Sequence, residues 1–296
     1  MGYADIGPFG NKTLRTPHLD RFAKEGMRFT SFYATPVCSM SRASLLTGCY
    51  NARISMPGVL FPPNRIGLHP DEVTVAEVAK SRGYETMMIG KWHLGHFPEF
   101  LPTRQGFDHY FGLPYSNDMK QSRAGFPPLP LYRDEKIVET EPDQSQLTRR
   151  YTEEAVKFLR TKREKPFFLY LPHYAVHTPL GGKPDVIAKY QAKAAKLPDL
   201  KQKNATYAAL VESVDDSLGT IRTALKRLKL DENTIIVFTA DNGGLLPITD
   251  NSPFRVGKGS AYEGGVRVPL IIHAPGVTKA GTVDPTPAMT IDLYPT

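Results

Sequence analysis

The chain has 296 residues, of which 41% are hydrophobic and 23% are charged, a composition typical of a globular protein that can bury a full core. Its formal net charge of +7 is spread along the chain and not gathered into an arginine-rich arm, which argues against nucleic-acid binding and favours acidic substrates. Two cysteines exclude a disulfide scaffold and a zinc finger, and no apolar run approaches the roughly 18 residues of a transmembrane helix.

The first half of the chain alternates helical and extended patterns. Pro17 and Gly26 bound a short helix, an aromatic-rich strand follows over 27–33, and a second helix begins at Cys38 and ends at Gly48. A capping box at 74–77 opens a third helix, which is followed by a strand over 84–89. Residues 96–145 have no clear periodicity and are predicted to form a long, ordered loop.

The second half repeats the alternation of helix and strand. Helical patterns cover 145–162 and 204–228, and each leads to a continuous apolar strand, at 166–171 and 234–239. The lysine-rich residues 183–203 are predicted to be a solvated surface segment, and a last strand covers 268–273. Helices that alternate with apolar strands indicate an α/β fold with a mostly parallel central sheet and helices on both faces.

Polar clusters follow these strands or open the helix after a strand, where functional loops of such sheets gather. They contain three fixed cations, two histidines that can carry protons and two oxygen ligands suited to a hard divalent ion. So much positive charge favours an oxyanion substrate, a sulfate or phosphate ester. The members are Cys38, Arg42, Lys91, His93, His177, Asp241, Asn242 and Lys258.

Two of these clusters also have simpler explanations. Cysteines near helix starts are commonly buried packing residues, although Arg42, four residues after Cys38, lies on the same helix face. Asp241-Asn242-Gly243 is a good turn sequence, and its position after an apolar strand is what favours metal binding.

Together these segments resemble the type I sulfatases of the alkaline-phosphatase superfamily, the group of arylsulfatases and lysosomal sulfatases. Five pieces match in the family's order and cover almost the whole chain. They are Cys38-Ser-Met-Ser-Arg42 with Ala-Ser-Leu-Leu-Thr-Gly, Gly90-Lys-Trp-His-Leu-Gly95, His177-Thr-Pro179, Thr239-Ala-Asp-Asn-Gly243, and Gly257-Lys-Gly259 with Tyr262-Glu-Gly-Gly-Val-Arg267. The resemblance implies an alkaline-phosphatase-like sulfatase domain that hydrolyses sulfuric esters of carbohydrates or aryl groups.

In that family the motif cysteine, here Cys38, is converted to formylglycine, whose hydrate attacks sulfur. A geminal diol can expel sulfate by re-forming its carbonyl, an exit that an unmodified thiol lacks. The resemblance implies that Arg42 holds the hydrate, that Lys91 and Lys258 bind sulfate oxygens, and that His93 takes the proton when the aldehyde re-forms.

The resemblance also implies further roles around the same pocket. His177 would protonate the leaving alcohol, and Ser116 would be a polar residue that contacts substrate. Asp241, Asn242 and the formylglycine at Cys38 would bind Ca²⁺. The expected partners are a sulfated small molecule or glycan and the formylglycine-generating or sulfatase-maturating enzyme, with no nucleic acid and no membrane span; the expected location is periplasmic or secreted.

The sequence departs from the family pattern in three places. Two consecutive aspartates usually precede the Gly-Tyr pair, and here only Met1 precedes Gly2-Tyr3. Met40 stands where proline, alanine or serine is usual, and the chain ends where the family continues into a C-terminal subdomain. Residues 1–296 are therefore predicted to be a truncated sulfatase catalytic domain without its first strand, poorly active because two metal ligands are missing.

Two other functions stay open at this stage. A phosphodiesterase or phosphonate hydrolase of the same superfamily would use a similar site, and an inactive oxyanion-binding fragment would retain only part of it. The substrate entrance is expected in residues 96–143, with Arg104 and Arg123 as candidate contacts.

Overall fold

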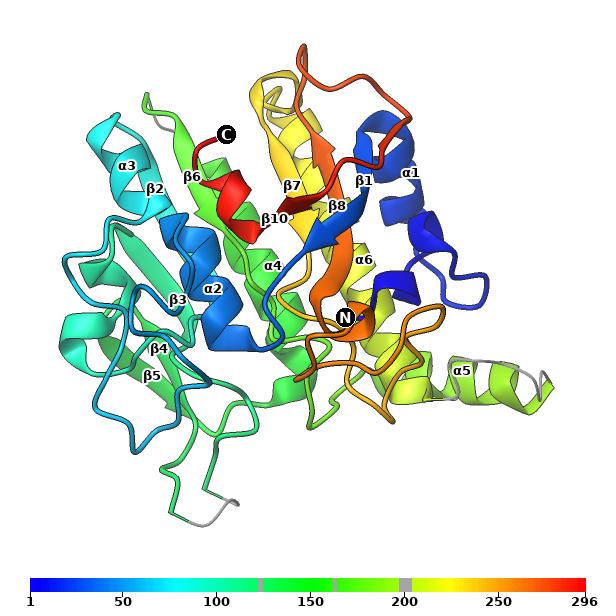
Figure 1. Cartoon of the computed structure of the whole chain (residues 1–296), viewed down its shortest axis with the longest axis horizontal. Coiled ribbons are helices and arrows are strands. Elements are labelled where there is room, and N and C mark those ends of the chain that lie inside the picture. Colours follow the sequence, from blue (N-terminus) through cyan, green and yellow to red (C-terminus); the bar gives the residue numbers. More distant parts are fainter. Residues whose placement is uncertain (122–124, 162–163, 197–203) are drawn as a thin grey trace. The chain divides into compact units, whose positions relative to one another are not determined.

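The computed structural model describes residues 1–121, 125–161, 164–196 and 204–296 (Figure 1). The chain forms two compact units, each assembled from separate stretches. Unit 1 comprises Met1–Val37 and Leu180–Met289, and unit 2 comprises Cys38–Pro179 and Thr290–Thr296. The prediction of one catalytic domain over 1–296 stays a prediction.

Unit 1 has a sheet in the order β10-β1-β8-β7, with β9 also paired to β1. Helices α1 and α6 pack against each other, and α5 packs against α6. The elements are α1 (Pro17–Glu25), β1 (Met27–Tyr33), α5 (Pro184–Lys196), α6 (Ala205–Arg227), β7 (Ile236–Thr239), α7 (Glu263–Val266), β8 (Arg267–His273), β9 (Thr282–Asp284) and β10 (Ala288–Met289), with short 3-10 helices at Tyr3–Asp5, Gly7–Phe9 and Asp231–Asn233.

Unit 2 has a sheet in the order β5-β4-β3-β2-β6. Its 3-10 helix at Thr290–Leu293 returns the end of the chain to helix α2. The elements are α2 (Cys38–Thr47), α3 (Val75–Ser81), β2 (Glu85–Lys91), β3 (His109–Leu113), β4 (Pro130–Arg133), β5 (Lys136–Thr140), α4 (Gln144–Arg160) and β6 (Phe167–Tyr170), with 3-10 helices at Pro98–Phe100 and Pro102–Arg104.

Helices cover both faces of the sheet in unit 2, as the alternation of side chains on its strands shows. Tyr110 of β3 belongs to the core cluster that contains Leu46 of α2 and Ala76 of α3. Its neighbour Phe111 points to the opposite face, where its ring contacts that of Tyr151 of α4 with centroids 6.1 Å apart. The predicted α/β layering is therefore confirmed for this unit.

The prediction of a mostly parallel sheet is only partly met, because both sheets are mixed. Strands β2, β3 and β6 run parallel, whereas β1 with β8, β7 with β8, β3 with β4, and β4 with β5 are antiparallel. The chain passes from β7 to β8 through a long loop that ends in the short helix α7 and not through a covering helix. Such a connection lets β8 return antiparallel to β7.

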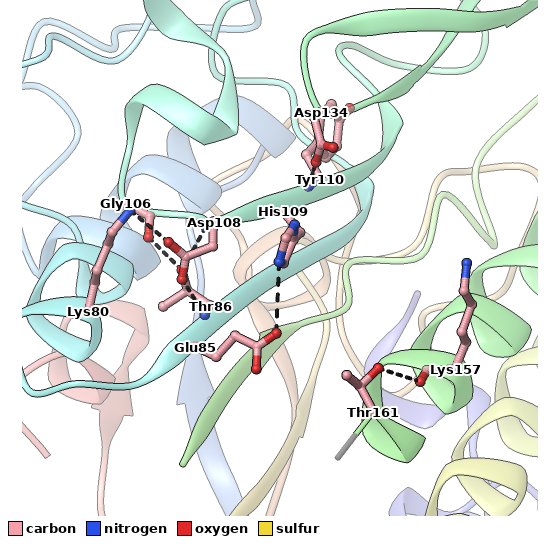
Figure 2. Close-up of polar contacts among 10 residues, drawn as sticks. All are labelled: Lys80, Glu85, Thr86, Gly106, Asp108, His109, Tyr110, Asp134, Lys157 and Thr161. Atoms are coloured by element: carbon pink, nitrogen blue, oxygen red, sulfur yellow. Dashed lines mark hydrogen bonds and ion pairs between the residues drawn. The ribbon is translucent and has the colours of Figure 1, made fainter. Parts of the chain in front are cut away.

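A network of polar contacts fixes the beginnings of β2 and β3 at one end of this sheet (Figure 2). The Oδ2 atom of Asp108 accepts a hydrogen bond of 3.0 Å from the backbone N–H of Thr86, and its Oδ1 atom lies 2.8 Å from the Nζ atom of Lys80 on α3. The ring of His109 lies 3.8 Å from the carboxylate of Glu85. These contacts hold the two parallel strands in register at their amino-terminal ends. Lys91 lies at the opposite, carboxyl-terminal end of β2.

Three segments differ from the sequence predictions. Residues 96–145 contain the strands β3, β4 and β5, where a loop was expected, and the lysine-rich segment contains helix α5, whose Tyr190 is buried. Residues 197–203 of that segment lie outside the described residues. Strands β6 and β7 were expected to be fully buried, yet each ends its sheet, and Val237 of β7 is 45% exposed. Two further short strands, β9 and β10, follow β8.

Candidate active site

The nine predicted site residues divide between the two units. Three belong to unit 1: Asp241, Asn242 and Lys258. Six belong to unit 2: Cys38, Arg42, Lys91, His93, Ser116 and His177.

In unit 2 the three parallel strands deliver site residues at the same edge. Lys91 ends β2, Ser116 follows β3, and His177 follows β6, as expected for carboxyl ends of parallel strands. Backbone pairing continues past the strands, because the N–H of Lys91 donates to the carbonyl of Pro172 at 2.8 Å and that of His93 to Pro114 at 3.0 Å. These bonds fix the backbone that carries the side chains.

Two cationic side chains are linked in a buried chain of hydrogen bonds. The guanidinium of Arg42 donates to the carbonyl oxygen of Lys91, and the Nζ atom of Lys91 donates to the Oγ atom of Ser116 at 3.0 Å. All three side chains are buried, with Lys91 only 2% exposed. Burial of cations costs desolvation energy, and an oxyanion bound beside them would offset that cost.

The backbone of Leu60 connects His93 to the start of α2. Its N–H donates to the Oγ atom of Ser39 at 3.2 Å, and its carbonyl oxygen lies 2.9 Å from the Nε2 atom of His93. Ser39 directly follows Cys38, which is the first residue of α2 and is 3% exposed. The N-terminal end of a helix favours negative charge, so an anionic group at position 38 would be stabilised there.

The hydrogen bond to Leu60 determines the tautomer of His93. A carbonyl oxygen can only accept, so Nε2 carries the proton, and Nδ1, which is buried and has no hydrogen-bond partner among the described residues, is the basic atom. Burial, with the nearby charges of Lys91 and Arg42, lowers the pKa of His93 well below its usual range. The ring is therefore neutral at neutral pH and able to accept a proton.

His177 has a different environment from His93. Its Nδ1 atom donates to the carbonyl of Thr178 at 2.6 Å, so a second proton would be carried on Nε2. The carboxylate of Asp118 lies 3.9 Å from Nδ1 and would balance the charge of a protonated ring. Asp118 was not predicted, because it belongs to none of the motifs that carry the family resemblance.

The unit 1 set is held by a glycine-rich turn that follows β7. The backbone N–H of Gly243 donates to Gly265 at 2.9 Å, and the N–H of Lys258 donates to the carbonyl of Gly244 at 2.9 Å. A side chain at position 243 would place its Cβ atom 1.8 Å from the carbonyl of Gly264, so only glycine allows this approach. The turn therefore joins the Asp241-Asn242 pair to the Lys258 segment.

The donor set of this turn fits a hard cation such as Ca²⁺. Asp241 supplies carboxylate oxygens, and the Nδ2 atom of Asn242 donates to the carbonyl of Gly243 at 2.8 Å, so its Oδ1 atom is the one suited to a metal. Asn242 is 4% exposed. Ca²⁺ takes six to eight oxygens, so other oxygens would have to complete its coordination. The buried carboxylate of Asp5 is engaged by Tyr207 and Thr249 instead.

A second acidic cluster lies in unit 1, apart from the predicted residues. Ligand atoms of His18, Asp215 and Asp216 lie within 4.8 Å of one another. The two oxygens of Asp215 accept the backbone N–H groups of His18 and Leu19, at 3.1 and 2.7 Å. Asp215 therefore caps the start of α1, which explains its burial without a metal.

The two candidate contacts of the predicted entrance loop, Arg104 and Arg123, stay predictions. Arg104 is the last residue of the 3-10 helix at Pro102–Arg104 and forms an ion pair of 3.0 Å with Glu135. Arg123 lies outside the described residues. No motif in the sequence distinguishes these two arginines from ordinary surface arginines.

A family model for sulfatases, described as "Sulfatase", matches residues 1–296. The chain belongs to the sulfatase family. It is 37% identical to N-acetylgalactosamine-6-sulfatase of Rattus norvegicus over 327 residues, with 100% of this chain and 59% of that protein covered. It is also 37% identical to arylsulfatase A of Homo sapiens over 330 residues, with 100% and 61% covered. The chain thus spans about three fifths of the length of these relatives.

Solved structures agree with this sulfatase membership. The crystal structure of Ps i-CgsB in complex with k-i-k-neocarrahexaose has a TM-score of 0.86 and 34% identity, and covers 100% of this chain and 68% of that one. A sulfatase from Pseudoalteromonas sp. has a TM-score of 0.83 and 30% identity, with 99% and 64% covered. The predicted family and the sulfatase-like α/β fold are confirmed. Among the described residues, no helix is long and apolar enough to span a bilayer.

Proposed function

We propose that this sulfatase-family chain hydrolyses sulfuric esters, using a formylglycine made from Cys38 and a Ca²⁺ ion. The observation that carries the proposal is the buried chain of Arg42, Lys91 and Ser116 beside a neutral His93. A fixed cation and a hydroxyl that donate to an oxyanion in a buried site stabilise the charge that develops during ester cleavage.

Lys91 and Ser116 would bind sulfate oxygens in this proposal. Lys91 is held by Ser116 at 3.0 Å, so its ammonium group is oriented before substrate arrives. Such preorganisation avoids the cost of ordering a long, flexible side chain during the reaction. Arg42 binds the backbone of Lys91 and would place a second positive charge near the residue derived from Cys38.

The two histidines would move protons in opposite directions. His93 is neutral, and its Nδ1 atom would accept a proton as the ester-cleaving residue is regenerated. His177 would carry a proton on Nε2 and donate it to the leaving alcohol, with Asp118 balancing its charge. The different environments of the two rings support this division.

A modified residue and a metal ion would complete the chemistry. A formylglycine hydrate at Cys38 would supply the oxygen nucleophile. The Ca²⁺ ion, held in part by Asp241 and Asn242, would polarise the ester oxygens. Lys258 would bind sulfate, as its place in the family motif implies.

The substrate class follows from the relatives and is a proposal for this chain. The curated relatives are named for a sulfated amino sugar and for aryl sulfates, and one structural neighbour was crystallised with a neocarrahexaose. We infer that the substrate is a sulfated carbohydrate or an aryl sulfate. The net charge of +7 suits such anions.

The test compares turnover of 4-nitrophenyl sulfate and of bis(4-nitrophenyl) phosphate by protein produced together with a sulfatase-maturating enzyme. We expect a higher kcat/KM on the sulfate ester than on the phosphodiester. Cys38→Ala should abolish turnover, whereas Cys49→Ala, the matched control, should retain it.

Two results would contradict the proposal. A higher kcat/KM on the phosphodiester would assign the chain to phosphodiester chemistry. An aldehyde at Cys38 without turnover of any sulfate ester would leave an oxyanion-binding protein without catalytic activity.

A further inference from the structure

Asn251 lies in the loop between β7 and α7 and is 2% exposed. Its Oδ1 atom accepts the backbone N–H of Gly244 at 3.0 Å. Its Nδ2 atom donates to the carbonyl of Gly244 at 2.9 Å and to the carbonyl of Val256 at 3.0 Å. Both N–H groups of the amide therefore donate a hydrogen bond, and its oxygen accepts one. The two donors of this buried amide are fully used.

These bonds join two segments that carry proposed site residues. Gly244 closes the turn that begins at Asp241, and Val256 stands two residues before Lys258. The carbonyl of Gly244 accepts from Asn251 and also from the backbone N–H of Lys258, at 2.9 Å in each case. One carbonyl thus connects the turn of the metal ligands to the lysine segment, and Asn251 holds that carbonyl in place.

The backbone packs tightly against the amide of Asn251 at two glycines. A Cβ atom at Gly244 would lie 2.6 Å from the Oδ1 atom of Asn251, and one at Gly257 would lie 2.6 Å from its Nδ2 atom. Two glycines therefore allow the backbone to approach the amide from both sides. The planar amide of asparagine places its donors and its acceptor at the distances that these backbone groups require.

A second set of hydrogen bonds anchors this loop two residues before Asn251. The hydroxyl of Thr249 donates to the Oδ1 atom of Asp5 at 2.6 Å, and the Oδ2 atom of Asp5 accepts from the hydroxyl of Tyr207 on α6. Asp5 is 1% exposed. The backbone on which Asn251 stands is therefore held in place by hydrogen bonds to the buried Asp5.

We propose that Asn251 is a positioning residue that sets the Asp241-Asn242 turn and Lys258 in one arrangement, so that cation and sulfate binding depend on each other. The inference rests on the proposed function for the roles of those three residues. It predicts that loss of the amide donors weakens both kinds of binding, as changes in groups that orient metal ligands do, by roughly 10- to 100-fold.

Asn251→Asp is the variant that separates positioning from packing. It keeps the size of the side chain but places a carboxylate oxygen against the carbonyls of Gly244 and Val256, so repulsion should move the side chain away from both the carbonyl and the N–H of Gly244. Asn233→Asp is the matched control, because Asn233 is exposed in the same unit and the charge change is identical. Thermal unfolding of both variants measures any general loss of stability.

Two readouts decide the proposal. The first is hydrogen exchange at the amides of Gly244 and Lys258, which should lose protection in Asn251→Asp and keep it in Asn233→Asp. The second is calorimetric titration with Ca²⁺ and with inorganic sulfate, in which the dissociation constants of Asn251→Asp should rise roughly 10- to 100-fold.

Each outcome has one meaning. Unchanged exchange at Gly244 and Lys258 overturns the proposal. Faster exchange with unchanged affinities for Ca²⁺ and sulfate also overturns it and makes Asn251 a structural residue only. If the parent chain binds neither ion, the failure belongs to the proposed function, and the exchange pattern still decides whether Asn251 holds the two segments together.

Discussion

The Nζ atom of Lys91 donates a hydrogen bond of 3.0 Å to the Oγ atom of Ser116, and the two side chains are 2% and 1% exposed. Lys91 ends β2, and Ser116 follows the neighbouring parallel strand β3. The bond therefore joins two segments 25 residues apart at the edge where the proposed sulfate site lies. It orients a buried ammonium group that would otherwise have several rotamers.

Removal of the Ser116 hydroxyl should weaken catalysis more than folding. Ser116→Ala removes the hydroxyl that accepts a hydrogen bond from the ammonium of Lys91, and we expect kcat/KM on 4-nitrophenyl sulfate to fall by about tenfold, the equivalent of one hydrogen bond to a charged group. Steady-state kinetics of the matured protein measure this. Ser81→Ala, an exposed serine on α3, is the control, and equal kcat/KM for both variants would contradict the role of Ser116.

Replacement of Lys91 should raise the pKa of His93. Burial is the main cause that lowers this pKa, and the charge of Lys91 is the next. Lys91→Met removes the charge but keeps an apolar chain of similar length, so the pKa should move toward 6.5. The ring carbon shifts of His93 in an NMR pH titration report the change. Lys80→Met, at the opposite end of the sheet, should leave the titration of His93 unaltered.

Acid should destabilise the protein partly through His173. Desolvation of its ring lowers the pKa of this histidine from 6.5 to about 4. Between these values the unfolded chain binds a proton that the folded chain does not, so stability is complete above pH 6.5 and falls as the pH drops toward 4. The loss from this group is roughly 3 kcal/mol.

The test of His173 is the difference between the free energies of unfolding at pH 7 and at pH 4. His173→Gln should reduce that difference by roughly 3 kcal/mol, since glutamine does not titrate. His69→Gln, an exposed histidine, should not reduce it. Identical pH dependence in the parent and in His173→Gln would contradict the assignment.

Gly90 should tolerate no side chain. Its φ of +128° is one that other residues rarely adopt, and a Cβ atom there would lie 2.1 Å from the carbonyl oxygen of Pro172. We expect Gly90→Ala to lower the free energy of unfolding by about 3 kcal/mol or more. Urea unfolding compares it with Gly58→Ala, where the space is open. Equal stability of the two variants would contradict this prediction, because it would show that the backbone near Gly90 and Pro172 can move apart.

Much of the fold could be predicted because long helices and capped starts have local causes. Thr74 and Glu77 form the expected capping box, and α4 and α6 follow the expected apolar stripes. Strand direction was less predictable. β1 pairs with β8 across more than 200 residues, and nothing local specifies that the pair is antiparallel.

The strands in 96–145 were missed for a similar reason. Each is four or five residues long, and β5 reads Lys-Ile-Val-Glu-Thr, with two adjacent apolar residues that are both exposed. Such a strand has no alternation to detect and is specified by its partner β4. Asp118, beside His177, was missed because it belongs to none of the matching motifs.

Motif residues at strand ends were easier to predict than the residues that hold them. Lys91 and His93 stand in a recognisable sequence after an apolar strand, and the structure links them to Ser116 and Leu60. Asn251 stands before Ser252 and Pro253 and reads as an ordinary turn residue. Its three hydrogen bonds depend on the close approach of Gly244 and Gly257, which no pattern in the sequence indicates.

The central claim is that Cys38 is the precursor of the catalytic nucleophile. Peptide mass spectrometry of protein produced with a sulfatase-maturating enzyme tests it most directly, with the peptide that contains Cys49 as the internal control. We expect an aldehyde at Cys38 and an unmodified thiol at Cys49. A free thiol at Cys38 in that protein would contradict it.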